Sequence, residues 1–287
     1  METFEHKPEL AKRHGTNGRN GKRKLIASKW RWQQRGESGL WVSDLVKHQA
    51  RHADKLCVLS GMHTDIANHT PAMLLLHTGS FTFARPSLGS WLLYGLGTAN
   101  QNLPGFVSIC PPLINGGTSN YGTAFLPSVY QGTAIGDIKT PVRNARIGNI
   151  SNPRLGTSAQ RKQLDLLQSI NRDLATRAPY DTRIDGVIQS YELAFRMQAE
   201  LPQVMDLSSE TRSTQQMYGI GEGRRSDNFG RQCLMARRLI EAGVRHVEVC
   251  DEFWDQHGGL KKGHQARADA TDQPAAALLA DLEQRGL

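Results

Sequence analysis

The feature of this sequence that most constrains the fold is an alternation of short apolar runs with longer segments typical of helices. These runs predict buried strands at residues 56–60, 105–110 and 244–250. The first run is apolar throughout, as in a strand that is covered on both faces. The segments typical of helices occupy residues 38–50, 71–77, 161–174, 182–200, 229–242 and 273–285. Strands and helices that alternate in this way favour a mostly parallel sheet between helical layers, which is an α/β fold.

Positive charge is concentrated at the start of the chain. The sequence carries a net charge of +8, but residues 1–35 hold ten Lys and Arg against three Glu, a net of +7. We therefore expect residues 1–37 to form a basic, poorly ordered arm and residues 38–287 to form the α/β domain. Within that domain, residues 116–153 are rich in Gly, Asn and Pro. A loop of this length is expected to line a site or to hold an insertion.

This distribution of charge also bears on the partners of the protein. A domain that binds nucleic acid usually spreads basic residues over one folded face, so their concentration in the arm disfavours nucleic acid as a partner. Trp30 and Trp32 lie among the basic residues and keep a nucleic-acid-binding arm, residues 12–35, open as an alternative. No apolar run approaches the roughly 18 residues of a membrane span, and the first residues lack the apolar core of a signal peptide.

The cysteines do not resemble a disulfide framework or a zinc knuckle. They lie far apart in the sequence, at Cys57, Cys110, Cys233 and Cys250. Three of the four fall in apolar runs, so small thiols in the core are the expected role.

A loop with metal-ligating side chains follows the predicted strand at residues 244–250. It is rich in Gly and carries Asp255, His257 and His264. Open α/β sheets bind ligands at the carboxyl ends of their strands, where this loop would lie. Asp and His are ligands for zinc and similar metals, and the Asp-x-His spacing lets two side chains of one loop reach one ion. Because this spacing is not a strong motif by itself, a purely structural role for these residues stays open.

The loop before the predicted helix at residues 71–77 holds a second group of reactive side chains. They are His63, Asp65, His69 and Thr70. A helix N-terminus favours bound anions, because its N–H groups and its dipole point at the ligand. A hydroxyl there is well placed to attack phosphorus or sulfur. The alternative is that Asn68 or Thr70 only caps the helix. In a parallel sheet the two loops would share one edge, so we expect their ligands to converge.

Motifs along almost the whole chain resemble the domain of unknown function 1501 family. They lie at residues 7–12, 62–69, 85–91, 94–97, 100–104, 126–132, 190–198 and 254–257. That family looks like a relative of the sulfatases within the alkaline phosphatase superfamily. The resemblance implies an α/β/α sandwich with a mostly parallel sheet and a metal-assisted hydrolase site. It also implies export, often through a twin-arginine signal, and therefore a periplasmic or secreted full-length protein.

The chain departs from the family pattern at both ends and within the site. Members usually begin with a signal, an apolar strand and a Gly-Gly-Pro-Ser segment, and continue into a strand near a Gly-Gly-Glu-Phe-Gly-Arg segment. We therefore expect an incomplete domain, truncated at both ends. When the sulfatase motif Cys-x-Pro-x-Arg is laid over this sequence, His69 replaces the cysteine and Met73 the arginine. These replacements count against formylglycine chemistry and leave Thr70 or Thr64 as the nucleophile.

Together these features predict the central part of an exported, sulfatase-like hydrolase that acts on sulfate or phosphate esters of small molecules or glycans. The expected metal ligands are Asp255, His257 and His264, and the cofactor is a divalent metal such as zinc, calcium or magnesium. The expected catalytic residues are Thr70, His63, Asp65 and His69. As truncated, the chain is expected to have little or no activity. The alternative is a non-enzymatic surface or scaffolding protein that keeps the fold.

Overall fold

The structure is a computed structural model that describes residues 2–19, 21–145, 150, 152 and 154–287. Residues 146–149, 151 and 153 of the predicted long loop lie outside the described residues. The chain divides into two compact units. The first contains Met1–His63, Thr211–Gly230 and Phe253–Gly286, and the second contains Thr64–Glu210, Arg231–Glu252 and Leu287. The predicted boundary between residues 37 and 38 falls inside the first unit.

The first unit contains a β-hairpin where the sequence predicted the start of a helix. Strand β1 (Trp32–Arg35) pairs antiparallel with β2 (Leu40–Ser43). The turn is held by the Asp54 carboxylate, which accepts hydrogen bonds from the backbone N–H groups of Glu37 and Ser38 at 3.1 and 2.8 Å. The helix predicted from residue 38 was wrong. The first apolar residues of that segment alternate with a period of two, which suits a strand, and this strand pairs with β1.

Further short elements complete this part of the first unit. They are the helix α1 (Pro8–Lys12) and the 3₁₀ helices η1 (Asp44–Val46) and η2 (Gln49–Lys55). The strand predicted at residues 56–60 was wrong. No described strand pairs with this run, and its Cys57 is exposed. An apolar run forms a strand only where a neighbour satisfies its backbone N–H and C=O groups.

The long helix α8 (Leu260–Arg285) packs against η1, η2 and the short helix α6 (Arg212–Met217). It confirms the helix predicted at residues 273–285 but begins well before it. Two buried acids of α8 hold the surrounding segments. Asp272 accepts backbone N–H groups of His48 and Gln49 at 2.8 and 2.9 Å, and Asp281 accepts the Tyr218 hydroxyl at 2.9 Å.

The second unit is built on a parallel sheet with the strand order β4-β3-β5. Strand β3 (Phe106–Ile109) lies at the centre, and β5 (His246–Val249) pairs with it in parallel. Both strands and their parallel pairing confirm the prediction from the apolar runs. Strand β4 (Thr133–Ile135) was not predicted, because it is only three residues long and lies inside the Gly-rich segment.

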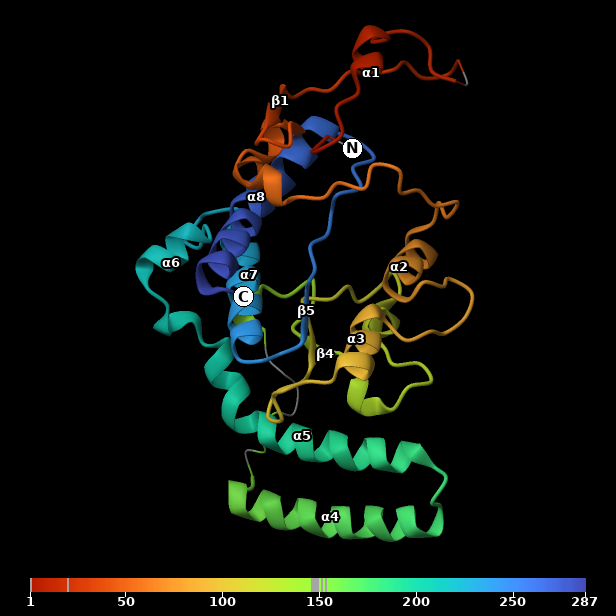
Figure 1. The fold of residues 1–287 in the computed structure, drawn as a ribbon, viewed down its shortest axis with the longest axis vertical. Helices are drawn as coiled ribbons and strands as arrows, with labels where there is room; N and C mark the ends of the chain where they lie inside the picture. Colours follow the sequence, from red (N-terminus) through yellow and green to blue (C-terminus); the bar gives the residue numbers. More distant parts are fainter. Residues whose placement is uncertain (1, 20, 146–149, 151, 153) are drawn as a thin grey trace. The chain divides into compact units, whose positions relative to one another are not determined.

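Helices cover both faces of this sheet. Successive side chains of β3 point to opposite faces, so each face packs against its own helices. On one face, Val107 and Ile109 belong to a core cluster with residues of α5 (Thr182–Met205) and α7 (Asp227–Glu241). On the other face, the Phe106 ring lies against α3 (Leu88–Leu96) at Gly89. Figure 1 shows the second unit with these helices around the sheet.

The helix α4 (Thr157–Arg177) packs beside α5 as an antiparallel hairpin (Figure 1). The Arg161 guanidinium donates two hydrogen bonds to Glu192, at 2.8 and 3.0 Å. The Gln168 side chain donates to the carbonyl of Ile188 at 2.8 Å. These contacts confirm the two predicted helices and extend them. None of the helices in the described part of the chain is both long and apolar enough to cross a membrane.

Candidate functional site

The predicted anion site begins at the N-terminus of α2 (His69–Thr78). Asn68 precedes this helix in an extended conformation, and its side-chain oxygen accepts the backbone N–H of Thr70 at 3.1 Å. Asn68, rather than Thr70, is therefore the cap. Because Asn68 fills this role, the Thr70 hydroxyl is not needed to begin the helix.

A half-buried contact between two polar side chains connects α2 to the sheet. The Nδ1 atom of His77, on the last turn of α2, lies 2.8 Å from the Glu248 carboxylate on β5. The Ser108 hydroxyl of β3 donates to the same carboxylate at 2.8 Å. Burial alone would raise the pKa of Glu248, but the hydrogen bonds from His77 and Ser108 outweigh it and the pKa lies below its ordinary value. This contact fixes the direction of α2 and hence the position of its N-terminus.

The loop after β3 reaches the same end of α2. The Thr70 hydroxyl donates to the Asn115 side-chain oxygen at 3.3 Å, and the Asn120 amide donates to the Asn115 carbonyl at 3.1 Å. Asn115 has a φ of 57° and Cys110, directly after β3, has a φ of 52°. Both values are unfavourable for residues with a side chain, and such backbone strain occurs preferentially at functional sites.

The other predicted catalytic residues are exposed to solvent. His69 is the first residue of α2 and is exposed. Asp65 is exposed on the loop before the helix. His63 is also exposed, with its Nδ1 atom 3.5 Å from the Gly61 carbonyl, and it belongs to the first unit.

Two of the predicted metal ligands form a close pair in the first unit. The His257 Nε2 atom lies 2.7 Å from the Asp255 carboxylate, and the two side chains are 87% and 52% exposed. The loop that carries them begins at Phe253, which has a φ of 69°. It ends at Gly259, directly before α8. The pair is therefore presented to solvent by a short loop with one strained residue.

The third predicted ligand has a different environment. His264 does not lie in the loop, because α8 begins at Leu260. Its ring packs against Trp254 and Trp30, with ring centroids 5.9 and 6.2 Å away. His264 does not join Asp255 and His257 in a group of ligand atoms within 4.8 Å of one another. Its role as a metal ligand stays a prediction, and its observed contacts are with the two indole rings.

The two predicted groups of residues divide between the units. Asp255, His257 and His264 lie in the first unit, whereas Asp65 and His69 lie in the second. The expected convergence of the two loops therefore stays a prediction.

The cysteines near the sheet are poor nucleophiles. Burial, aided by the charge of Asp137, raises the pKa of Cys110 to about 11. Burial, aided by Glu248, raises the pKa of Cys250 to about 12. Both thiols are therefore protonated at neutral pH. Cys110 and Cys233 are core thiols as predicted, but Cys57 is exposed.

Two features of the site were missed by sequence reasoning. Glu248 is a carboxylate inside a strand that was predicted to be buried, and an acidic residue at such a position was a usable signal. Asn115 follows Pro111-Pro112 after β3 and precedes two glycines, which is typical of a special turn. Its contact with Thr70 has no sequence signal, because the two residues are far apart in the chain.

Comparison with protein families matches residues 1–287 to a family described as "Protein of unknown function (DUF1501)". The chain belongs to the DUF1501 family. This confirms the resemblance at the level of the family. No curated protein and no solved structure matches this DUF1501 chain.

The basic arm of the DUF1501 chain makes contacts inside the first unit. The indole N–H of Trp30 donates to the Gln265 side chain on α8 at 3.0 Å. The Trp32 ring lies 5.5 Å from the ring of His6. Both indoles are half-buried, so they are less available for stacking on bases than exposed rings would be.

Proposed function

We propose that this protein is a metal-dependent hydrolase of sulfate or phosphate esters, and that the full-length protein is exported. The observation that carries the proposal is the exposed Asp255–His257 pair, whose ligand atoms lie 2.7 Å apart. Two ligands on one short loop can enter a metal's coordination shell with little rearrangement. The sulfatase-like ancestry that the family resemblance implied supports the same chemistry.

The proposed ligand set is suited to zinc or a similar divalent cation. Imidazole and carboxylate together favour borderline metals, and a bound metal would supply Lewis-acid polarisation of the ester. In this proposal Asp255 and His257 are the principal ligands and His264 completes or supports them.

In this proposal the anionic part of the ester binds at the N-terminus of α2. The N–H groups of the first helical turn stabilise an anionic ester, and the Thr70 hydroxyl attacks its phosphorus or sulfur atom. His69 or Asp65 accepts the hydroxyl proton and returns it to the ester oxygen, which leaves as an alcohol. Water then hydrolyses the ester formed on Thr70: the same group accepts a proton from the water and returns it to the Thr70 oxygen, which frees sulfate or phosphate. Asn115, which accepts the Thr70 hydroxyl at 3.3 Å, positions the nucleophile.

The function is tested by assaying generic aryl sulfate and aryl phosphate esters with the longest protein that the gene encodes. We expect turnover that is abolished by a chelator and restored by zinc, and that the Thr70→Val variant loses. Turnover that persists after chelation would contradict metal dependence. Full activity of Thr70→Val would remove the hydroxyl from its proposed role.

A scaffolding role is the second candidate, because α4 presents apolar side chains to solvent. Leu166, Ile170 and Leu174 recur at every fourth residue and are 65%, 59% and 51% exposed. Such a stripe is typical of a helix that contacts another protein. No turnover of any ester by a metal-loaded protein would favour this second function.

A further inference from the structure

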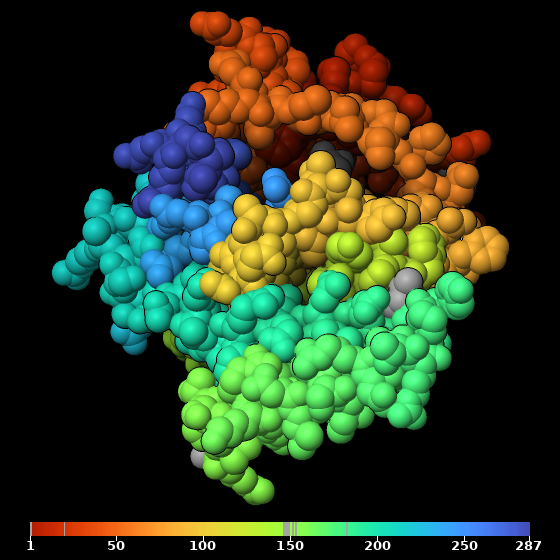
Figure 2. Space-filling model, turned by 60° about the horizontal axis from the view of Figure 1, so that its bottom comes forward, coloured from red at the N-terminus to blue at the C-terminus, as the bar shows by residue number. Residues whose placement is uncertain are grey.

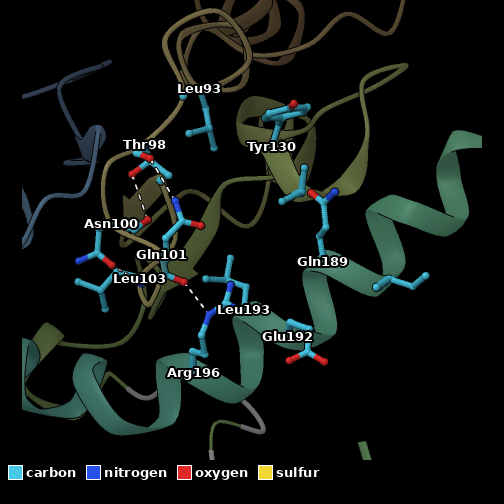
Figure 3. A pocket seen from close by; sticks show the side chains of 14 residues that line it. Leu93, Thr98, Asn100, Gln101, Leu103, Tyr130, Gln189, Glu192, Leu193 and Arg196 are labelled. Carbon is cyan, nitrogen blue, oxygen red and sulfur yellow. Dashed lines mark hydrogen bonds between the residues drawn. The ribbon is translucent and has the colours of Figure 1, made fainter. Parts of the chain in front are cut away.

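We propose that the second unit holds a binding site for a small organic carboxylate with an apolar, ring-containing body. The site is a cavity of about 390 Å³ that opens to solvent. It lies between α3, α5, the loop that joins α3 to β3, and the 3₁₀ turn η4 (Ser128–Tyr130) (Figure 3). In Figure 2 the yellow surface of α3 and its following loop borders the teal surface of α5. The volume is at the lower end of the range for small-molecule sites.

The cavity is separate from the proposed ester site within the second unit. Its lining includes Gly105, which immediately precedes β3, and Tyr130, which lies shortly before β4. These residues mark the amino ends of the parallel strands. Cys110, by contrast, follows the carboxyl end of β3, in the direction of the loop that contacts α2. The cavity therefore lies toward the amino ends of the parallel strands, and the N-terminus of α2 lies toward their carboxyl ends.

One part of the lining is apolar, and its aromatic ring packs against a neighbouring ring. It consists of Leu93, Leu103, Val129, Ile188 and Leu193. The Tyr130 ring completes it, and the ring of Tyr94 packs edge-on against Tyr130 with centroids 5.4 Å apart. A fixed aromatic face beside branched aliphatic side chains favours a flat apolar body, which can stack or pack edge to face.

The charged part of the lining consists of Glu192 and Arg196. Glu192 is already occupied, because its carboxylate accepts hydrogen bonds from Arg161 and from Gln168. The Arg161 bonds lower the pKa of Glu192 to about 2, so it remains ionised and compensated at neutral pH. Arg196 donates through its Nε to the Gln101 carbonyl at 2.7 Å, as Figure 3 shows. This bond holds the guanidinium at the cavity.

The remaining donors of Arg196 determine the class of ligand. Among the described residues, no hydrogen bond engages its two Nη groups, and it is the one cationic side chain of the lining. A planar carboxylate matches the two parallel donors of a guanidinium. The side chains of Gln101 and Gln189 add amide groups to other parts of the lining, and Gln189 lies on the side of Tyr130 (Figure 3). A dianionic phosphate would need a second cation, so a monoanionic carboxylate fits this site better.

The first test compares charged and neutral ligands of the same shape. Calorimetric titration of the whole chain with 2-naphthoate is expected to give saturable binding. Naphthalene-2-carboxamide, its neutral counterpart, is expected to bind about ten-fold more weakly, because it cannot form the charged pair. Equal affinity for the two probes, or no saturable binding of naphthoate up to millimolar concentration, would overturn the proposal.

The second test places the ligand in this cavity. Arg196→Gln is expected to weaken naphthoate binding about ten-fold, and Arg183→Gln is the matched control on the same helix. Arg183 is not part of the lining and pairs with Asp181 at 2.6 Å. Gln189→Trp fills the cavity from an exposed position and is expected to abolish binding, while circular dichroism confirms that the variant folds. Binding that is unaffected by Gln189→Trp, or lowered equally by both arginine variants, would show that the ligand binds elsewhere.

Discussion

The Nδ1 atom of His77 lies 2.8 Å from the carboxylate of Glu248, and this pair joins α2 to the central sheet. The Glu248 side chain is only 19% exposed and also accepts the Ser108 hydroxyl. Glu248→Gln keeps the shape but removes the charge, and we expect it to lower the free energy of unfolding by about 1–3 kcal/mol. Urea denaturation measures the change. Glu222→Gln, at an exposed position, is the control and should change stability little. Equal losses of stability in both variants would contradict the stabilising role of the Glu248 contact with His77.

The hairpin of α4 and α5 should respond to acid through Glu192. Hydrogen bonds from Arg161 lower its folded-state pKa to about 2, from an ordinary value of 4.5. A carboxyl whose pKa is lowered by folding stabilises the protein above its unfolded pKa, and this contribution is lost as the pH falls through the folded pKa. We expect the melting temperature to decline between about pH 4.5 and pH 2, and Glu192→Gln to flatten that decline. A variant with the same pH profile as the wild type would disprove the link.

The geometry of the same pair predicts that lysine cannot replace Arg161. Its guanidinium donates to both oxygens of Glu192, and an ammonium group cannot reproduce this fork. Because the pair is partly exposed, Arg161→Lys is expected to cost about 1 kcal/mol of stability. Hydrogen exchange of the amides of α4 should become faster in this variant. Arg172→Lys, elsewhere on α4, should leave the exchange unchanged.

Two glycines of α3 should respond in opposite directions to the same substitution. A Cβ on Gly89 would lie 2.5 Å from the Phe106 ring and 2.7 Å from the His246 ring, whereas a Cβ on Gly95 would meet nothing within 4 Å. Gly89→Ala should therefore destabilise the protein by about 1–3 kcal/mol through overpacking. Gly95→Ala should stabilise it by up to about 1 kcal/mol, because alanine favours helix. Denaturant melts of the two variants that shift in the same direction would refute this description of α3.

The fold was predictable from sequence where an apolar pattern had a single structural solution. Val107 and Ile109 lie in a short, mostly apolar run that ends at Pro111, and such a run favours a buried strand. The segment from Leu40 was ambiguous, because its first apolar residues fit a strand and its later ones fit a helix. The first part of this segment forms a strand because it pairs with β1, and this tertiary contact cannot be predicted from the local sequence pattern.

The candidate site was predictable in its residue types and less so in its environment. Asp255 and His257 lie close together, because their spacing within one loop constrains them, and their role as metal ligands stays a prediction. His264 was predicted to lie in the loop but lies in α8. The glycines after His257 are typical of a loop, so the start of α8 at Leu260 was not predicted. Its packing between Trp30 and Trp254 depends on residues far away in the chain.

The proposed metal site is tested most directly by calorimetric titration of the whole chain with zinc at neutral pH. We expect one zinc ion to bind, with an affinity that falls about ten-fold or more in both His257→Gln and Asp255→Asn. His14→Gln and Asp269→Asn change an exposed imidazole and an exposed carboxylate elsewhere in the first unit, and should bind zinc as the wild type does. The same zinc affinity in the wild type and in His257→Gln would contradict the account.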